Sequence, residues 1–83
     1  MKKIEIKVTK YYKKEERFVT LACQFKSEII AELYGREYNA KSIMNTLLIE
    51  NADKILFTIA GADEKEAEKA IKGYFKGENE RNV

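Results

Sequence analysis

Three stretches of the chain alternate between apolar and polar residues, and this alternation limits the possible folds more than any other feature. They cover residues 2–9, 28–34 and 54–60. Successive side chains of a β-strand point to opposite faces, so a period of two predicts strands that bury one face. The expected inward residues are Ile4, Ile6, Val8, Ile29, Ala31, Leu33, Ile55, Phe57 and Ile59.

A fourth, shorter strand is expected over residues 37–40. The preceding Tyr34-Gly35-Arg36 is typical of a tight turn, because Gly35 can adopt a positive φ without a steric penalty. The runs on either side of this turn therefore form a hairpin, and the short partner is expected at the edge of the sheet.

Helical periodicity fills the segments between the strands. The first helix is expected over residues 15–26, and the second begins at Ser42, whose hydroxyl can accept a backbone N–H of the first turn. The third begins near Asp63, which has the spacing of a capping box with Glu66, and runs to Gly77. The apolar stripes of the first and third helices are Phe18, Leu21, Ala22 and Phe25, and Ala67, Ala70, Ile71, Tyr74 and Phe75.

The element order is therefore β-α-β-β-α-β-α, which predicts an α+β fold. Four short strands with one apolar face each imply a single sheet, with helices over that face and solvent on the other. We expect one domain over residues 1–83, with residues 78–83 as a frayed tail.

Composition narrows the function classes. The net charge is only +2, which argues against a nucleic-acid partner, and no apolar run reaches the roughly 20 residues of a membrane span. A single cysteine cannot form an internal disulfide, and together these features predict a cytoplasmic protein.

Residues suited to catalysis are scarce. The chain has no histidine, so Cys23 lacks an activating base and is expected to be a half-buried structural thiol. Without a cluster of Cys and His there is no zinc pattern, and no glycine-rich phosphate loop is present. We expect no enzyme activity, no metal, no cofactor and no small-molecule substrate.

A basic and aromatic segment follows the first strand. Lys10, Lys13 and Lys14 are interleaved with Tyr11 and Tyr12, a pattern that can bind an anion or nucleic acid. The same residues also suit a solvated basic loop, and the sequence leaves both interpretations open.

The hexapeptide Asn39-Ala40-Lys41-Ser42-Ile43-Met44 resembles the second-helix sequence of the HPr proteins, the histidine-containing phosphocarriers of the bacterial sugar phosphotransferase system. Matches at Phe18-Val19, Gly35 and Ala60-Gly61-Ala62-Asp63 extend the resemblance over residues 18–75. It implies an open-faced β-sandwich, with strand order 1-4-2-3 and three helices on one face.

The resemblance also implies a phosphorylated histidine at the start of the first helix, and this chain departs from it. Counted back from Phe18 without gaps, Tyr11 occupies the histidine position, Lys13 the arginine position and Lys14 the proline position. A phenol with a pKa of about 10 is a poor nucleophile at neutral pH and forms a stable ester. We therefore do not expect ordinary phosphocarrier activity, although Lys13 and Lys14 remain anion-binding candidates.

Two further sites follow from the resemblance. Ser42 matches the serine that a regulatory kinase phosphorylates in HPr of many low-GC Gram-positive bacteria, and Lys41 lies beside it. Ser42 can equally be a helix cap and nothing more. Ile43, Met44 and Leu47 match the apolar patch that docks partner proteins, and core packing is the alternative for each; Ile49 is expected in the core.

Three functions remain open. The first is an HPr-like regulatory protein that binds phosphotransferase components, HPr kinase or a transcription regulator, switched by phosphorylation at Ser42. The second is a phosphoryl carrier that uses Tyr11 or Cys23. The third is an HPr-fold scaffold with an unrelated binding role, such as nucleic-acid binding through residues 10–14.

Overall fold

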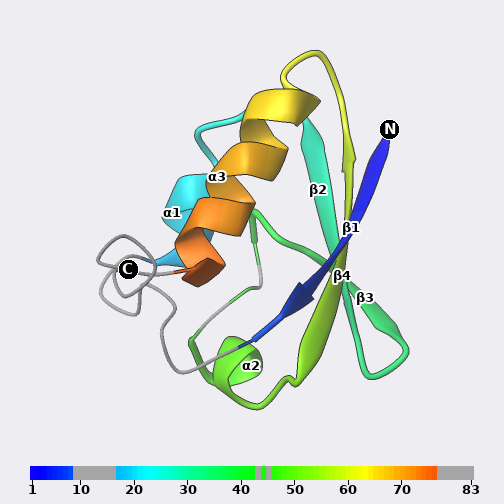
Figure 1. Cartoon of the computed structure of the whole chain (residues 1–83), viewed down its shortest axis with the longest axis vertical. Helices are drawn as coiled ribbons and strands as arrows, with labels where there is room; N and C mark the ends of the chain where they lie inside the picture. Colours follow the sequence, from blue (N-terminus) through cyan, green and yellow to red (C-terminus); the bar gives the residue numbers. More distant parts are fainter. Residues whose placement is uncertain (9–16, 43, 45, 77–83) are drawn as a thin grey trace.

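The computed structural model describes residues 1–8, 17–42, 44 and 46–76. Its elements follow the expected order, and three helices lie on one side of a four-stranded sheet (Figure 1). The segment 9–16, with Tyr11, Lys13 and Lys14, lies outside the described residues, as do Ile43 and residues 77–83. The elements are β1 (Lys2–Lys7), α1 (Phe18–Ala22), β2 (Glu28–Leu33), β3 (Arg36–Asn39), α2 (Thr46–Glu50), β4 (Lys54–Ala60) and α3 (Glu64–Lys76).

The sheet has the order β1-β4-β2-β3 and is antiparallel throughout, which confirms the predicted α+β open-faced sandwich. The register brings Ile4 of β1 and Ala31 of β2 to either side of Phe57 of β4. The predicted alternation is confirmed, because the inward residues of β1, β2 and β4 are all buried. Of the expected inward residues only Val8, one residue beyond β1, is partly buried.

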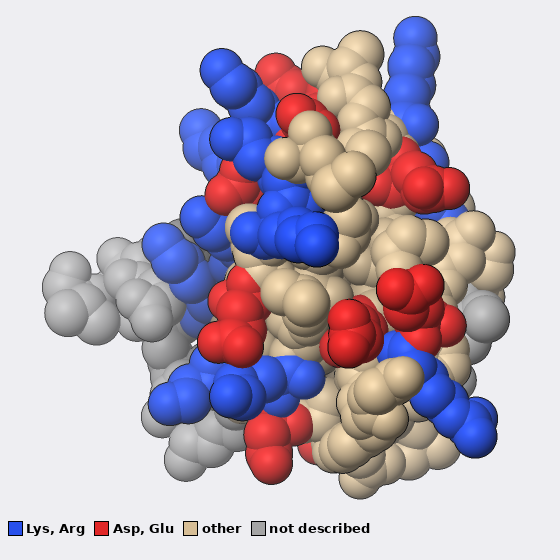
Figure 2. Space-filling view, turned by 90° about the vertical axis from the view of Figure 1, so that its right-hand side faces the viewer, with Lys and Arg blue, Asp and Glu red and all other residues tan. Residues whose placement is uncertain are grey.

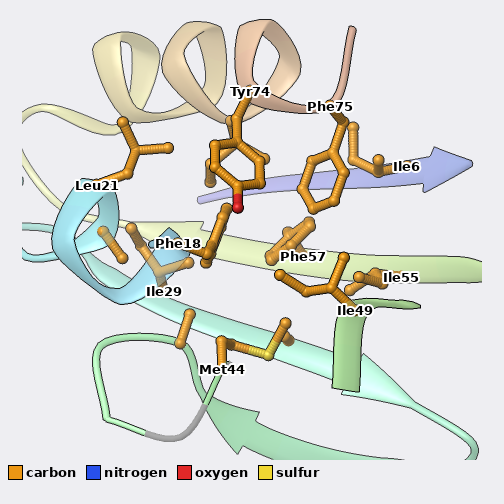
Figure 3. Packing of buried hydrophobic residues seen from close by; sticks show 14 of the residues in the cluster. Ile6, Phe18, Leu21, Ile29, Met44, Ile49, Ile55, Phe57, Tyr74 and Phe75 are labelled. Atoms are coloured by element: carbon orange, nitrogen blue, oxygen red, sulfur yellow. The ribbon is translucent and has the colours of Figure 1, made fainter. Parts of the chain in front are cut away.

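Aromatic side chains occupy the space between the sheet and the helices (Figure 3). The ring centroid of Phe18 on α1 lies 5.4 Å from that of Phe57 on β4, 5.1 Å from Tyr74 and 5.7 Å from Phe75, both on α3. Aromatic pairs at such separations attract one another beyond the effect of their buried area. This cluster therefore fixes α1 and α3 to the middle of the sheet.

The opposite face of the sheet carries charged and half-buried side chains (Figure 2). The described helices lie on the other side of the sheet (Figure 1). Glu32 of β2 is paired directly with Glu37 of β3, and Lys7 of β1 with Lys54 of β4. Like charges directly opposite each other weaken strand pairing. The stability of the sheet therefore comes from its covered face.

The β2–β3 turn confirms the role of Gly35 and adds one feature. Gly35 has a φ of 76°, and Tyr34 before it has a φ of 53°. Two successive residues with positive φ are typical of the type I′ hairpin turn, whose twist matches that of the strands. The sequence pattern missed Tyr34, because tyrosine is uncommon in this conformation.

The first helix ends earlier than predicted. It was expected to reach Lys26, but α1 ends at Ala22, with Cys23 as its C-cap. The N–H groups of Gln24 and Phe25 donate to Leu21 and Ala22 carbonyls, which tightens the last turn so that the chain can reach β2. Arg17 has extended backbone angles and precedes the helix, so the described part of the expected N-terminal extension is not helical.

The start of α3 is fixed to a distant loop. Asp63 does not form the predicted capping box with Glu66; its carboxylate accepts the Lys26 N–H at 2.8 Å, the Ser27 N–H at 2.9 Å and the Ser27 hydroxyl. Ser27 is only 1% exposed, and these bonds satisfy it. A serine between Lys26 and Glu28 gave no sign of burial, so the sequence pattern missed this contact.

The same bonds hold the pKa of Asp63 below its ordinary value, chiefly through the Ser27 hydroxyl and then through the Lys26 N–H. Glu64 accepts the Gly61 N–H at 3.4 Å and the amino group of Met1 at 3.2 Å. Within the described residues, no helix is long and apolar enough to cross a membrane.

Candidate functional site

The candidate site is the segment that joins β3 to β4, and its first part is a turn. Ala40 is fully buried, and its N–H donates to the carbonyl of Ile29 on β2. The N–H of Lys41 donates to the side-chain oxygen of Asn39 at 2.9 Å, and the N–H of Ser42 donates to the Asn39 carbonyl at 3.0 Å. Asparagine stabilises such turns because its side chain can replace a backbone acceptor.

Lys41 connects this turn to the loop that follows α1. Its Nζ donates to the Phe25 carbonyl at 2.7 Å, and its own carbonyl accepts the Cys23 thiol at 3.5 Å. One N–H of the Lys41 ammonium is therefore already bonded to the loop after α1. Cys23 is exposed, so the expectation of a half-buried thiol was wrong; the helix ends before it and turns its side chain outward.

Ser42 does not begin the second helix. It was expected as the N-cap, but α2 begins at Thr46, and Ser42 is an exposed residue of the preceding turn. The reason lies in Met44, which is only 2% exposed and inserts into the core before the helix starts (Figure 3). The hydroxyl of Ser42 is accessible, but the helix dipole that was expected to support a phosphate there is absent from it.

The three residues of the predicted docking patch have different positions. Met44 is buried in the core and cannot contact a partner in this structure, so its assignment to the patch was wrong. Leu47 is 68% exposed, as a docking residue would be. Ile43 lies outside the described residues. Ile49 is buried, as predicted, and belongs to the same hydrophobic cluster as Met44 (Figure 3).

The exposed side chains around this segment include both nucleophilic and apolar groups. The described part of the chain contains no group of three His, Cys, Asp or Glu side chains that could hold a metal ion. Among the described residues, the Ser42 hydroxyl and the Cys23 thiol are exposed nucleophilic groups at or beside the segment, and Leu47 is an exposed apolar residue on it. We refer to Ser42 and to Leu47 on α2 as the α2 surface.

Comparisons with known proteins agree on one family. A family profile described as the PTS HPr component phosphorylation site matches residues 13–77. The structure is similar to HPr-C-His from Thermoanaerobacter tengcongensis, with 29% identity, a TM-score of 0.72 and coverage of 92% of each chain.

Two other solved structures are similar. The phosphocarrier protein HPr of Bacillus anthracis has 29% identity and a TM-score of 0.70, over 88% of this chain and 94% of that one. The histidine-containing phosphocarrier protein of Mycoplasma has 27% identity and a TM-score of 0.67, over 86% of this chain and 88% of that one. No curated protein sequence gave a match. With this strand order, these three helices and a profile match over most of its length, the chain belongs to the HPr family of the phosphotransferase system.

Proposed function

We propose that this chain is a regulatory, protein-binding member of the HPr family that acts in the cytoplasm and does not carry phosphate on a histidine. The observation that supports this is the absence of histidine from all 83 residues of a chain with the HPr fold. A phosphoryl relay needs a group that forms a labile bond and exchanges it rapidly, as imidazole nitrogen does. Serine and tyrosine hydroxyls form stable esters instead, so they suit regulation rather than relay.

Leu47 supports a protein-binding role for the α2 surface. It is one of three large apolar residues in the described chain that are strongly exposed, the others being Met1 and Tyr34. Burying a leucine side chain at an interface contributes about 1.5–3 kcal/mol, whereas leaving it in water contributes nothing. We propose that phosphotransferase proteins, HPr kinase or a transcription regulator bind here.

Ser42 supplies the proposed switch. A phosphate would add a charge of about −1.5 to −2 to the same surface that presents Leu47, and this would alter partner choice. The nearest cation in sequence, Lys41, donates to the Phe25 carbonyl, so it would have to exchange that bond to pair with the phosphate. We therefore expect phosphorylation to loosen the contact between the 39–42 turn and the loop after α1.

The phosphorylation experiment uses the purified protein, HPr kinase and ATP, with intact mass as the readout. We expect the mass of one added phosphoryl group, lost in Ser42→Ala and retained in Thr20→Ala, which removes another exposed hydroxyl. An unmodified wild-type protein, or a phosphorylated Ser42→Ala, would contradict the switch.

A parallel incubation with phosphoenolpyruvate and enzyme I tests the relay itself. We expect no acid-labile label on the wild-type protein. If label appears and is lost in Tyr11→Phe or Cys23→Ser, the chain is a carrier that uses another residue, and the regulatory proposal fails.

The docking experiment measures binding to HPr kinase by calorimetry for wild type, Leu47→Ser and Tyr34→Asn. Tyr34 is the matched control, since it is an exposed apolar residue at the β2–β3 turn. We expect affinity to fall at least tenfold in Leu47→Ser alone. Equal affinities for all three proteins would place the interface elsewhere.

A further inference from the structure

A second surface lies on α3, away from the residues discussed above. Four lysines of this helix are exposed: Lys65, Lys69, Lys72 and Lys76. Their spacing of four, three and four residues places them within roughly 60° of arc on a helix with 3.6 residues per turn. They form a single line about 16 Å long on the side opposite the buried residues of α3, and we call it the lysine stripe.

Few carboxylates neutralise this stripe. Lys72 pairs with Glu68 at 3.0 Å, and Glu68 also lies 3.9 Å from Lys2. Among the described residues, no carboxylate lies within ion-pair distance of Lys65, Lys69 or Lys76. Glu66 is exposed on the flank of the helix rather than in line with the lysines. Within the part of the chain that the structure describes, three of the four ammonium groups therefore have no carboxylate partner and can bind an external anion.

The composition of the stripe identifies the partner. The large apolar residues of α3 lie on its other side, buried in the core, so the exposed side has no large apolar group to insert into a lipid surface. The buried residues are Ala67, Ile71, Tyr74 and Phe75. Protein interfaces are centred on apolar, aromatic or arginine side chains and are poor in lysine. No aromatic side chain of α3 is exposed, which removes the stacking platform that single-stranded nucleic acids use.

A regular line of flexible ammonium groups matches the phosphates of a duplex, which supply one negative charge per about 1.7 Å of helix axis. We propose that the lysine stripe of α3 binds the phosphate backbone of double-stranded nucleic acid without reading its sequence. The helix α3 contains no Asn or Gln to pair with adenine edges and no Arg to pair with guanine edges. The binding depends on local charge and not on the net charge of +2.

The test is fluorescence anisotropy of a labelled duplex DNA of arbitrary sequence, titrated with the full chain at several salt concentrations. Phosphate contacts by the three unpaired lysines predict a slope of log K against log salt of about −2.7, which is roughly a 40-fold loss of affinity between 50 and 200 mM salt. In Lys65→Gln/Lys69→Gln the slope should decrease in magnitude by about 2, one for each lysine removed.

The matched control is Lys3→Gln/Lys54→Gln, which removes the same charge from the open face of the sheet. We expect its affinity to stay within twofold of wild type. A nitrogen–proton correlation spectrum of the wild-type protein adds a readout that needs no variant, and duplex should shift the amides of α3 most.

The proposal would be overturned by no binding of duplex at about 25 mM salt or by equal losses of affinity in the two double variants. Tighter binding of single-stranded DNA or of vesicles of anionic lipid than of duplex would overturn it too. Tighter binding of inorganic polyphosphate than of duplex at equal phosphate concentration would overturn it as well.

Discussion

The two helices that follow β3 and β4 differ in how they are held, although both connect to the same sheet. α3 has 13 residues and buries Ala67, Ile71, Tyr74 and Phe75 along its whole length. α2 has five residues, and the core contacts around it come from Ile49 near its end and from Met44 before its start. A long helix can be anchored by the apolar residues along its own buried side, whereas a short helix depends on the segments beside it.

The largest effect that this comparison predicts is on α3. Phe75→Ala should lower the free energy of unfolding by about 4 kcal/mol, because large-to-small changes of a buried aromatic leave a cavity. Phe75 contacts Phe18 at 5.7 Å, Phe57 at 5.9 Å and Tyr74 at 5.1 Å between ring centroids. Urea unfolding measures it, with the half-buried Phe25→Ala as control. A loss no greater than that of the control would contradict the central role of the aromatic cluster.

The second prediction concerns the residue that decides where α2 begins. Met44→Ala should cost about 3 kcal/mol, since buried methionines truncated to alanine typically lose 2–5 kcal/mol. The same urea titration applies, and Leu47→Ala is the matched control on the exposed side of α2. If Met44→Ala changed stability by less than 0.5 kcal/mol, Met44 would belong to the docking surface after all.

The third prediction tests the fixed start of α3 through pH. The pKa of Asp63 is lowered in the folded state, so its contribution to stability is present above its ordinary value of 3.8 and is lost as pH falls through the folded value. Asp63→Asn should therefore make the thermal midpoint less dependent on pH below about 5.

Part of that dependence should remain in Asp63→Asn, because the pKa values of Glu64 and Glu68 are also lowered. Glu64 pairs with the amino group of Met1, and Glu68 with Lys72. A midpoint that followed pH identically in wild type and variant would show that the carboxylate bonds to Lys26 and Ser27 contribute nothing.

The fourth prediction is a gain in stability. Gly73 lies inside α3, and a methyl group added there would meet no atom within 4 Å. Gly73→Ala should raise the free energy of unfolding by about 0.5–1 kcal/mol, because glycine is a poor helix residue. As a contrast, Gly61→Ala should destabilise, since its methyl group would lie 2.6 Å from the Ser27 Cα. A loss in Gly73→Ala would mean that α3 packs more tightly there than the structure shows.

The smallest effect on stability is expected on the exposed side of α2. Leu47→Ser should change the free energy of unfolding by less than about 0.5 kcal/mol, as is usual for surface positions. Its effect should instead appear in partner binding. If Leu47→Ser unfolded the protein, the exposed leucine would be a structural residue and not part of an interface.

Predictions from the sequence were correct where one hydrophobic period, such as the alternation of a strand, runs through a whole element. Ile55, Phe57 and Ile59 had to share a face, because a one-residue shift in register would send all of them into solvent. The prediction for Gly35 was correct for a similarly local reason, since a tight turn needs positive φ. The strand order came from the resemblance, because pairing between distant strands leaves no local pattern.

Predictions from the sequence were wrong where a contact with another part of the fold determines the role of a residue. Ser42 has every local feature of an N-cap, yet the burial of Met44 delays the helix to Thr46. Asp63 has the spacing of a capping box, yet its carboxylate binds Lys26 and Ser27, which lie 37 and 36 residues earlier. In both cases a tertiary contact outweighs a capping bond, which contributes only about 1 kcal/mol.

The sequence by itself determined the buried face of each strand, the order of the elements and the loss of imidazole chemistry, since these depend on residue type and short-range periodicity alone. Only the tertiary structure decided that Met44 points inward and Leu47 outward, and that Lys41 donates to the Phe25 carbonyl. It also decided that, among the described residues, three of the four exposed lysines of α3 have no carboxylate partner. The physical reason is that a side chain's exposure depends on what packs against it, and those neighbours come from other parts of the chain.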